Sequence, residues 1–170
     1  ARIGRALTLD EAARVPGLLQ EAAALVVGYL GDTYDQDLPV VVIVESRMVA
    51  RVLLAEDEPL NQEVSQCLLE NVGLKVDLAE DGNQAVELAS RNRYALILMD
   101  MQMPQLNGLD ATRAIHASGL NQDTPIIAMT ANAFEEDKRR CLEAGMVDHI
   151  TKPIDRAQLY ATLLKWLKVA

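Results

Sequence analysis

From Arg51 to the end of the chain, short runs of aliphatic and β-branched residues alternate with longer amphipathic segments. The short runs have the length of strands and the longer segments have the apolar spacing of helices. Five strand and helix pairs in succession predict an α/β fold in which helices cover a parallel sheet. The expected strands are 51–56, 74–80, 95–100, 125–131 and 146–151, and the expected helices are 59–73, 82–92, 109–119, 134–145 and 155–169.

The expected strands differ in how deeply they should lie in the sheet. Residues 95–100 are uniformly apolar up to the final aspartate, so we expect a central strand covered on both faces. Residues 74–80 alternate between apolar and polar side chains, which indicates a strand toward the edge. Gly145 is expected to end one helix, and Asp155 is expected to cap the start of the last one.

The first 50 residues have a different composition from the rest of the chain. They contain neither Lys nor Asn, whereas the remainder contains several of each. A capping-box spacing at 8–11, an apolar stripe and the run at 38–44 predict helices followed by a strand. We therefore expect residues 1–50 to be an N-terminal extension or the remnant of an upstream domain, with an unknown role, and residues 51–169 to form the main domain.

The charge of the chain argues against nucleic acid as a direct partner. The formal net charge is −9, and the one short basic cluster, residues 138–140, lies among acidic residues and is interpreted as a solvated helix face. The longest uncharged apolar runs, 22–30 and 38–44, are less than half of the roughly 20 residues that cross a bilayer. With no visible signal peptide or membrane segment, and two widely separated cysteines, we expect a cytoplasmic chain.

Polar residues stand at the carboxyl ends of several expected strands, where open parallel sheets bind their ligands. Glu56 and Asp57 follow the first strand, Asp100 ends the third, Thr130 lies in the fourth, and Lys152 follows the fifth. If the first and third strands are neighbours, three carboxylates converge, and they would repel one another unless a cation joined them. Oxygen ligands in an open position suit Mg²⁺, and a lysine with a hydroxyl suits a phosphoryl group.

Each of these residues also has an ordinary interpretation when it is taken alone. A single aspartate at a strand end is most often a solvated turn residue, and Glu56 with Asp57 is most often a surface pair. Thr130 is a common strand residue, and Lys152 a common surface charge. Their occurrence together at one edge of the sheet, on different strands, favours a binding site.

Four ordered segments resemble one known family. They are LLAEDEPLNQ (53–62), LILMDMQMPQLNGLD (96–110), IIAMTANA (126–133) and HITKPI (149–154). Together they resemble the receiver domain of two-component response regulators, most closely the receiver modules of hybrid sensor histidine kinases, over about residues 51–169. The resemblance implies a flavodoxin-like (βα)5 doubly wound sheet with strand order 2-1-3-4-5, here preceded by the N-terminal extension.

The resemblance also implies roles for the site residues. Asp100 matches the aspartate that accepts a phosphoryl group from a phosphohistidine in a Mg²⁺-dependent reaction. Asp57, Asp100 and the backbone carbonyl of Gln102 match the Mg²⁺ ligands, and Glu56 acts on the metal indirectly or through water. Lys152 would pair with the phosphoryl group or, before phosphorylation, with Asp100.

Further positions of the family pattern concern switching and loop shape. Thr130 would bind a phosphoryl oxygen and move toward the site, and His149 stands at a switch position that is commonly aromatic. Gln102 and Asn132 match positions that tune the lifetime of the acyl phosphate. The resemblance also implies a cis peptide bond between Lys152 and Pro153, and a loop after Asp100 shaped by Pro104 and Gly108. For His149, a satisfied polar residue at a strand edge is the alternative.

The resemblance implies a histidine kinase or a histidine-phosphotransfer domain as the partner. In the helix after the first strand, we expect the apolar stripe of Leu60, Val64, Cys67 and Leu68 to face the core. Leu69 then projects to the opposite side, as part of a partner-binding surface or as an incidental exposed residue.

Two competing functions stay open at this point. A phosphatase or phosphotransferase with an aspartyl nucleophile needs a second aspartate where this chain has Gln102. A receiver-like interaction module that is never phosphorylated usually lacks one of the core residues, all of which are present. We therefore expect a phosphoacceptor that promotes its own phosphorylation rather than a turnover enzyme, from a hybrid histidine kinase.

Overall fold

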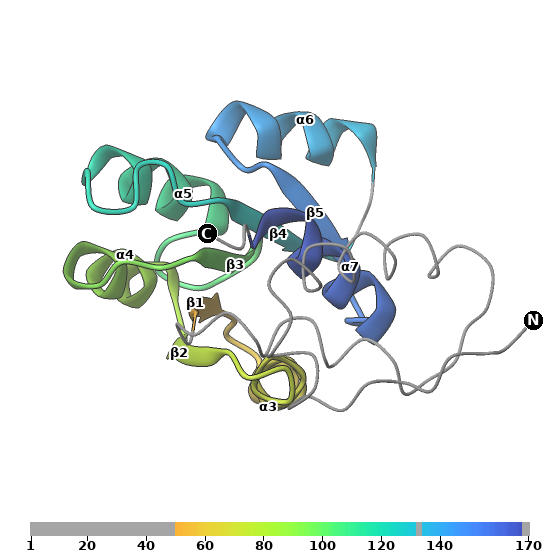
Figure 1. Cartoon of the computed structure of the whole chain (residues 1–170). Coiled ribbons are helices and arrows are strands. Elements are labelled where there is room, and N and C mark those ends of the chain that lie inside the picture. Colours follow the sequence, from red (N-terminus) through yellow and green to blue (C-terminus); the bar gives the residue numbers. More distant parts are fainter. Residues whose placement is uncertain (1–49, 132–133, 168–170) are drawn as a thin grey trace, which may run out of the picture. The chain divides into compact units, whose positions relative to one another are not determined.

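The computed structural model describes residues 50–131 and 134–167 (Figure 1). The strands are β1 (Arg51–Ala55), β2 (Lys75–Ala79), β3 (Leu96–Asp100), β4 (Ile126–Thr130) and β5 (Asp148–Thr151). The helices are α3 (Pro59–Glu70), α4 (Gly82–Arg91), α5 (Gly108–Ala117), α6 (Glu135–Ala144) and α7 (Arg156–Trp166). The elements predicted between 51 and 169 are all present, with ends moved by no more than three residues. The predictions for the N-terminal segment, its boundary and Asn132 fall outside the described residues and stay predictions.

All five strands of the sheet run parallel, in the order β2-β1-β3-β4-β5. This is the predicted flavodoxin-like arrangement, with the two fully buried strands β3 and β4 inside the sheet and the alternating β2 at its edge. Order reverses between β1 and β3, which places the switch point of the fold beside the end of β1.

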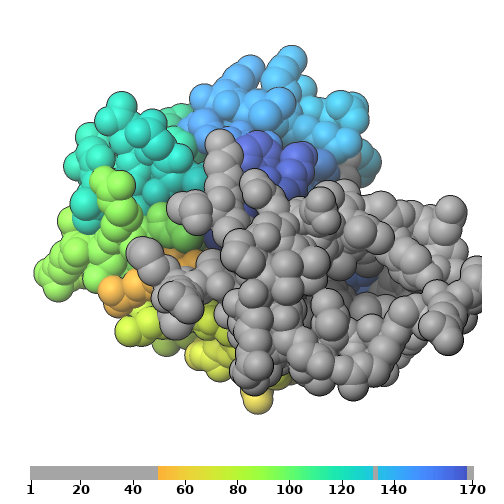
Figure 2. All heavy atoms as spheres, viewed as in Figure 1, coloured from red at the N-terminus to blue at the C-terminus, as the bar shows by residue number. Residues whose placement is uncertain are grey.

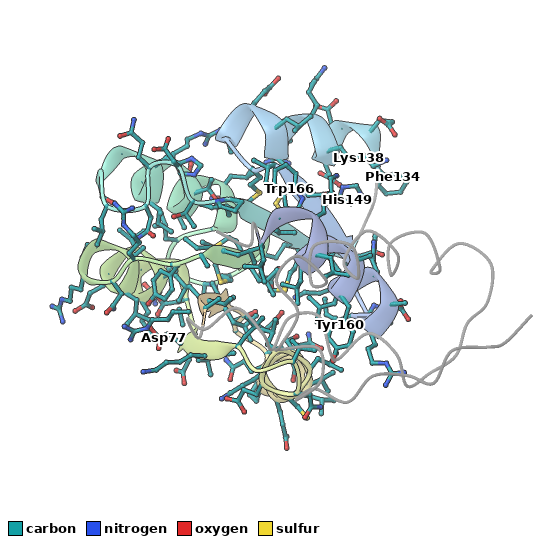
Figure 3. The ribbon with its side chains drawn as sticks, in the orientation of Figure 1. Asp77, Phe134, Lys138, His149, Tyr160 and Trp166 are labelled. Atoms are coloured by element: carbon teal, nitrogen blue, oxygen red, sulfur yellow. The ribbon has the colours of Figure 1, made fainter. Side chains whose placement is uncertain are left out.

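Helices cover both faces of the sheet (Figure 1). One core joins alternate strand residues, such as Leu53, Ile97 and Ile126, to α4, α5 and α6. Figure 2 shows the side chains of α5 and α6 as adjoining patches of the surface. On the other face, the hydroxyl of Tyr160 in α7 donates a hydrogen bond of 3.0 Å to the carbonyl of Leu68 in α3. Tyr160 is labelled between these helices in Figure 3.

The helix ends follow the sequence signals that predicted them. Asp155 caps α7 by accepting a 2.9 Å hydrogen bond from the backbone N–H of Gln158. Gly145 ends α6 with a φ of 99°, a left-handed conformation that side chains with a Cβ rarely adopt. In the described part of the chain, no helix is both long enough and apolar enough to cross a membrane.

The prediction for Leu69 is wrong. Leu69 is fully buried, and so are Ser65 on the same side of α3 and Val72 just after the helix, whereas Leu60 is 64% exposed and Val64 is 44% exposed. The rotation of α3 is fixed at both ends, because Gln62 donates to the carbonyl of Glu56 and Tyr160 donates to that of Leu68. The stripe with more apolar residues, which we expected in the core, therefore lies at the surface. Cys67 is also exposed.

Candidate functional site

The strand register brings the predicted site residues to one edge of the sheet. Ala55 in β1 pairs with Met99 in β3, so Glu56 comes level with Asp100. Asp100 pairs with Met129, which puts Thr130 one step further along the neighbouring strand. On the far side Thr130 pairs with Thr151, and Lys152 follows directly. The prediction that the residues at these strand ends lie together is confirmed.

Three carboxylates form the centre of this edge. Oxygen atoms of Glu56, Asp57 and Asp100 all lie within 4.8 Å of one another. Glu56 is fully buried, Asp100 is 4% exposed, and Asp57 faces solvent. The group thus has one open side, and its hard oxygen atoms are of the kind that a divalent cation such as Mg²⁺ takes as ligands. The residues present fit that ion.

Lys152 supplies the positive charge between two of the carboxylates. Its Nζ lies 2.6 Å from Oδ2 of Asp100, as a hydrogen bond, and 2.7 Å from Oε2 of Glu56. The second contact is an ion pair without good hydrogen-bond geometry. The pairing of Lys152 with Asp100 agrees with the arrangement expected before phosphorylation. The peptide bond from Lys152 to Pro153 is cis, as predicted.

Burial and pairing act in opposite directions on the two charges. Burial raises the pKa of Asp100 above its usual value, and the hydrogen bonds from Lys152 and from the backbone N–H of Gln102 only partly offset this effect. Burial also disfavours the charge of Lys152, but its contacts with Asp100 and Glu56 outweigh that cost and raise its pKa. Lys152 is therefore held as a cation beside the carboxylates.

Glu56 is oriented by α3 and the turn before it. Its Oε1 accepts hydrogen bonds from the backbone N–H of Glu58, at 3.2 Å, and from Nδ2 of Asn61, at 3.4 Å. Gln62 donates to the Glu56 carbonyl at 2.6 Å. The sequence analysis assigned no individual role to Asn61 or Gln62. The sequence signal that could have identified Asn61 and Gln62 is their position in the first turn of a helix that starts directly after the acidic residues.

The loop after Asp100 is held close to that residue. The backbone N–H of Gln102 donates to Oδ1 of Asp100 at 3.0 Å, and Gly108 donates to the carbonyl of Met101 at 3.3 Å. A Cβ at Gly108 would lie 2.1 Å from the carbonyl oxygen of Asp100, so only glycine allows this approach. The prediction that Gly108 shapes the loop is confirmed for this position. Pro104 lies in the same loop, in an exposed position.

Thr130 and His149 lie on the same face of the sheet. Thr130 is buried at the end of β4, whereas His149 in β5 pairs in register with Ala128, two residues before Thr130. The side chain of His149 is 30% exposed, with Nδ1 4.0 Å from Oδ1 of Asp148. Figure 3 shows His149 on the side of the molecule where α6 lies. This placement suits a switch between the site and the surface, and that role stays a prediction.

An open cleft of about 590 Å³ lies above these residues, between α3 and α6. Its lining includes Asn61 from α3 and, unexpectedly, Asp137 and Arg140 from α6. The sequence analysis interpreted residues 138–140 as a solvated face. That description fits Arg139, which pairs with Glu136, and it also fits Arg140, whose side chain is 55% exposed. The sequence did not show that Arg140 also lines the cleft.

Comparison with known proteins gives a consistent set of matches. Residues 52–164 match the family described as response regulator receiver domain. The signal transduction histidine-protein kinase BarA of Escherichia coli K12 is 40% identical over 122 residues, which cover 72% of this chain and 13% of BarA. The chain thus spans about an eighth of the length of that relative.

Two solved structures are informative. The receiver domain of sensor histidine kinase PA1611 from Pseudomonas aeruginosa PAO1, with magnesium coordinated in its active-site cleft, is 46% identical. Its TM-score is 0.67, and the match covers 71% of this chain and 98% of that one. The receiver domain of Ssk1, in complex with the histidine phosphotransfer protein Ypd1 of Saccharomyces cerevisiae, is 29% identical with a TM-score of 0.64. That match covers 69% of this chain and 88% of the other.

Proposed function

This chain belongs to the response regulator receiver domain family of two-component signalling, of the type found in hybrid histidine kinases, and from that membership we propose that it is a phosphorelay receiver. In this proposal Asp100 accepts a phosphoryl group from a phosphohistidine on a partner, and the domain then changes conformation. The observation that carries the proposal is the position of Asp100, which is buried at the sheet edge between a lysine and two further carboxylates.

In the proposed reaction, a carboxylate oxygen of Asp100 attacks the phosphorus atom of the phosphohistidine. The new O–P bond forms while the P–N bond breaks, and the electron pair of that bond stays on the imidazole nitrogen, which takes up a proton. Lys152 lies 2.6 Å from Asp100 and keeps its charge, so it is placed to balance the phosphoryl oxygens. Thr130 would offer its hydroxyl from the next strand.

Mg²⁺ is the proposed cofactor. Asp57 and Asp100 would hold the ion together with the backbone carbonyl of Gln102, while Glu56 would act through water or indirectly. The bound ion would supply positive charge that offsets the repulsion between the carboxylates and the phosphoryl oxygens. Support comes from the spacing of the three carboxylates and from the magnesium in the related PA1611 receiver.

The proposed partner is a histidine-phosphotransfer domain or a histidine kinase. The exposed apolar residues Leu60 and Val64 of α3 stand on the same helix as Asn61, which lines the cleft. A partner that covered them would bring its phosphohistidine to Asp100. The complex of Ypd1 with the Ssk1 receiver supports a partner of this class. Because a histidine kinase draws on ATP, we place this chemistry in the cytoplasm. The parent protein is proposed to be a hybrid histidine kinase.

The test is phosphorylation by a small acyl phosphate in the presence of Mg²⁺, followed by intact-mass and peptide mass spectrometry. The proposal expects one phosphoryl group on Asp100, which disappears in Asp100→Asn and persists in Asp110→Asn. Asp110 is a suitable control because it is exposed and pairs with Arg113 on α5. Continuous release of phosphate without a lasting adduct would favour a phosphatase, and no adduct at all would favour an interaction module.

A further inference from the structure

Arg140 of α6 lies in the wall of the cleft that holds Asp100, although nothing in the proposed reaction uses it. The helix stands beside β4 and β5 in Figure 1, across the cleft from α3. Asp137, one turn earlier on α6, lines the same wall. The cleft thus has a charged pair on the side opposite Asn61.

The contact between these two residues is loose. Nη1 of Arg140 lies 3.8 Å from Oδ1 of Asp137, which is longer than a hydrogen bond, and the side chain of Arg140 is 55% exposed. The neighbouring Arg139, by contrast, reaches Glu136 at 2.6 Å. Among the residues that the structure describes, Asp137 is the ion-pair partner of Arg140. Because this exposed contact is weak, the guanidinium of Arg140 can turn toward another anion at small cost.

The cleft has more negative than positive side chains, so a phosphoryl group that enters it requires a further cation. Its wall carries five carboxylates, from Glu56, Asp57, Glu58, Asp100 and Asp137, and two cations, from Lys152 and Arg140. Lys152 is already in contact with two of the carboxylates. A phosphoryl donor that enters the cleft carries further negative charge and meets repulsion from this wall. Arg140 is the cation that is not engaged at short range.

We infer that Arg140 is a phosphate-binding residue of the cleft, which leaves Asp137 and donates to the phosphoryl oxygens of the incoming donor while Lys152 still holds Asp100. The inference rests on the proposed function and adds a second, donor-facing cation to it. A guanidinium suits this task because its planar set of N–H groups can bind two phosphoryl oxygens at once. Asp137 then acts as the resting partner that holds Arg140 at the mouth of the site.

The experiment measures phosphorylation of the full chain by acetyl phosphate with Mg²⁺, over a range of donor concentrations. Arg140→Ala should lower the second-order rate constant about tenfold, because one charge-assisted interaction with the donor is lost. Arg140→Lys should recover part of that loss. Arg139→Ala is the matched control, since it removes the same charge from the same helix outside the cleft, and it should change the constant by less than about twofold.

A second measurement separates donor binding from effects on the metal site. Mg²⁺ affinity, followed by titration without any donor, should be unchanged or higher in Arg140→Ala, because removal of a nearby positive charge does not weaken a cation site. Beryllium fluoride, a phosphoryl mimic, should bind more weakly to Arg140→Ala at saturating Mg²⁺. Urea unfolding of both arginine variants confirms that they are folded.

The outcomes distinguish the two proposals. If wild type is phosphorylated on Asp100 but Arg140→Ala matches Arg139→Ala in rate and in beryllium fluoride affinity, the inference about Arg140 fails and the receiver function stands. If Arg140→Ala loses Mg²⁺ affinity in step with its rate, Arg140 acts on the carboxylates and the inference is again wrong. If wild type forms no adduct, the proposed function fails and the inference falls with it.

Discussion

Replacing Lys152 with methionine removes the cation that lies between two buried carboxylates. Glu56 is fully buried and Asp100 is 4% exposed, and Nζ of Lys152 lies within 2.7 Å of an oxygen atom of each. Removal of one partner from a buried ion pair typically costs about 3–5 kcal/mol, because the remaining charge has no compensation. The Lys152 side chain is 17% exposed, so water can reach part of the site. We expect the free energy of unfolding to fall by about 3 kcal/mol at pH 7 without metal.

The assay is urea unfolding, first with EDTA and then with Mg²⁺. Lys138→Met is the matched control, because its partner Glu135 has a side chain that is 90% exposed, and an exposed pair contributes less than about 1 kcal/mol. A ligand that binds only the folded state adds about 2.7 kcal/mol at a concentration a hundredfold above its Kd. Mg²⁺ should therefore restore most of the lost stability in Lys152→Met, and it should stabilise this variant more than wild type.

The reasoning is refuted by one clear result. If Lys152→Met and Lys138→Met unfold at the same urea concentration in EDTA, Lys152 does not balance the buried charges. A stability loss that Mg²⁺ leaves unchanged would also contradict the account, since it would point to lost packing of the lysine stem and not to unpaired carboxylates.

Three further predictions concern the core, the loop and the response to pH. Leu69→Ala should lower the free energy of unfolding, measured by urea titration, by about 3 kcal/mol, and Leu60→Ala should lower it by less than about 0.5 kcal/mol, because only Leu69 is buried. Equal losses of stability would contradict the observed rotation of α3. Gly108→Ala should slow phosphorylation by acetyl phosphate at least about tenfold, since the new Cβ displaces the backbone at Asp100. An unchanged rate would show that the loop accommodates the Cβ without moving Asp100. Burial opposes the charge of Asp148, but hydrogen bonds from two side chains and a backbone N–H outweigh it and lower its pKa. The stability that the ionised Asp148 contributes is thus present above its unfolded pKa of about 3.9 and is lost as pH falls through the lower folded value. Asp148→Asn should therefore lower the free energy of unfolding by about 1 kcal/mol at pH 7 and by less in acid. A loss of stability that does not depend on pH would argue against a role for the ionised form.

The sheet and the position of its carboxylates were predictable because they depend on local signals. Residues 96–99 and 126–129 are continuous apolar runs, and such runs are typical of strands covered on both faces. Once parallel strands are placed side by side, their carboxyl ends lie at the same edge of the sheet, so Asp100 and the residues after β5 come to that edge. The caps at Asp155 and Gly145 are local signals of the same kind.

The rotation of α3 and the role of α6 were not predictable in this way. Helix α3 has apolar residues on two sides, and periodicity alone favours the side of Leu60 and Val64. Which side faces the sheet depends on contacts made elsewhere, such as the hydrogen bond from Tyr160 to the carbonyl of Leu68. The position of Arg140 in the wall of the cleft likewise depends on where α6 packs. The sequence there shows only three acidic residues followed by three basic ones, a pattern that is common on solvated helices.

The hydrogen bond between Lys152 and Asp100 joins residues 52 positions apart, and the lysine follows the last strand of the domain. During synthesis on the ribosome, the acidic residues and Asp100 therefore leave the exit tunnel well before their counter-charge does. A nascent or truncated chain that ends before β5 can carry the carboxylates but not the lysine that neutralises them. The proposed acceptance of a phosphoryl group by Asp100 would therefore require the final strand and the lysine that follows it.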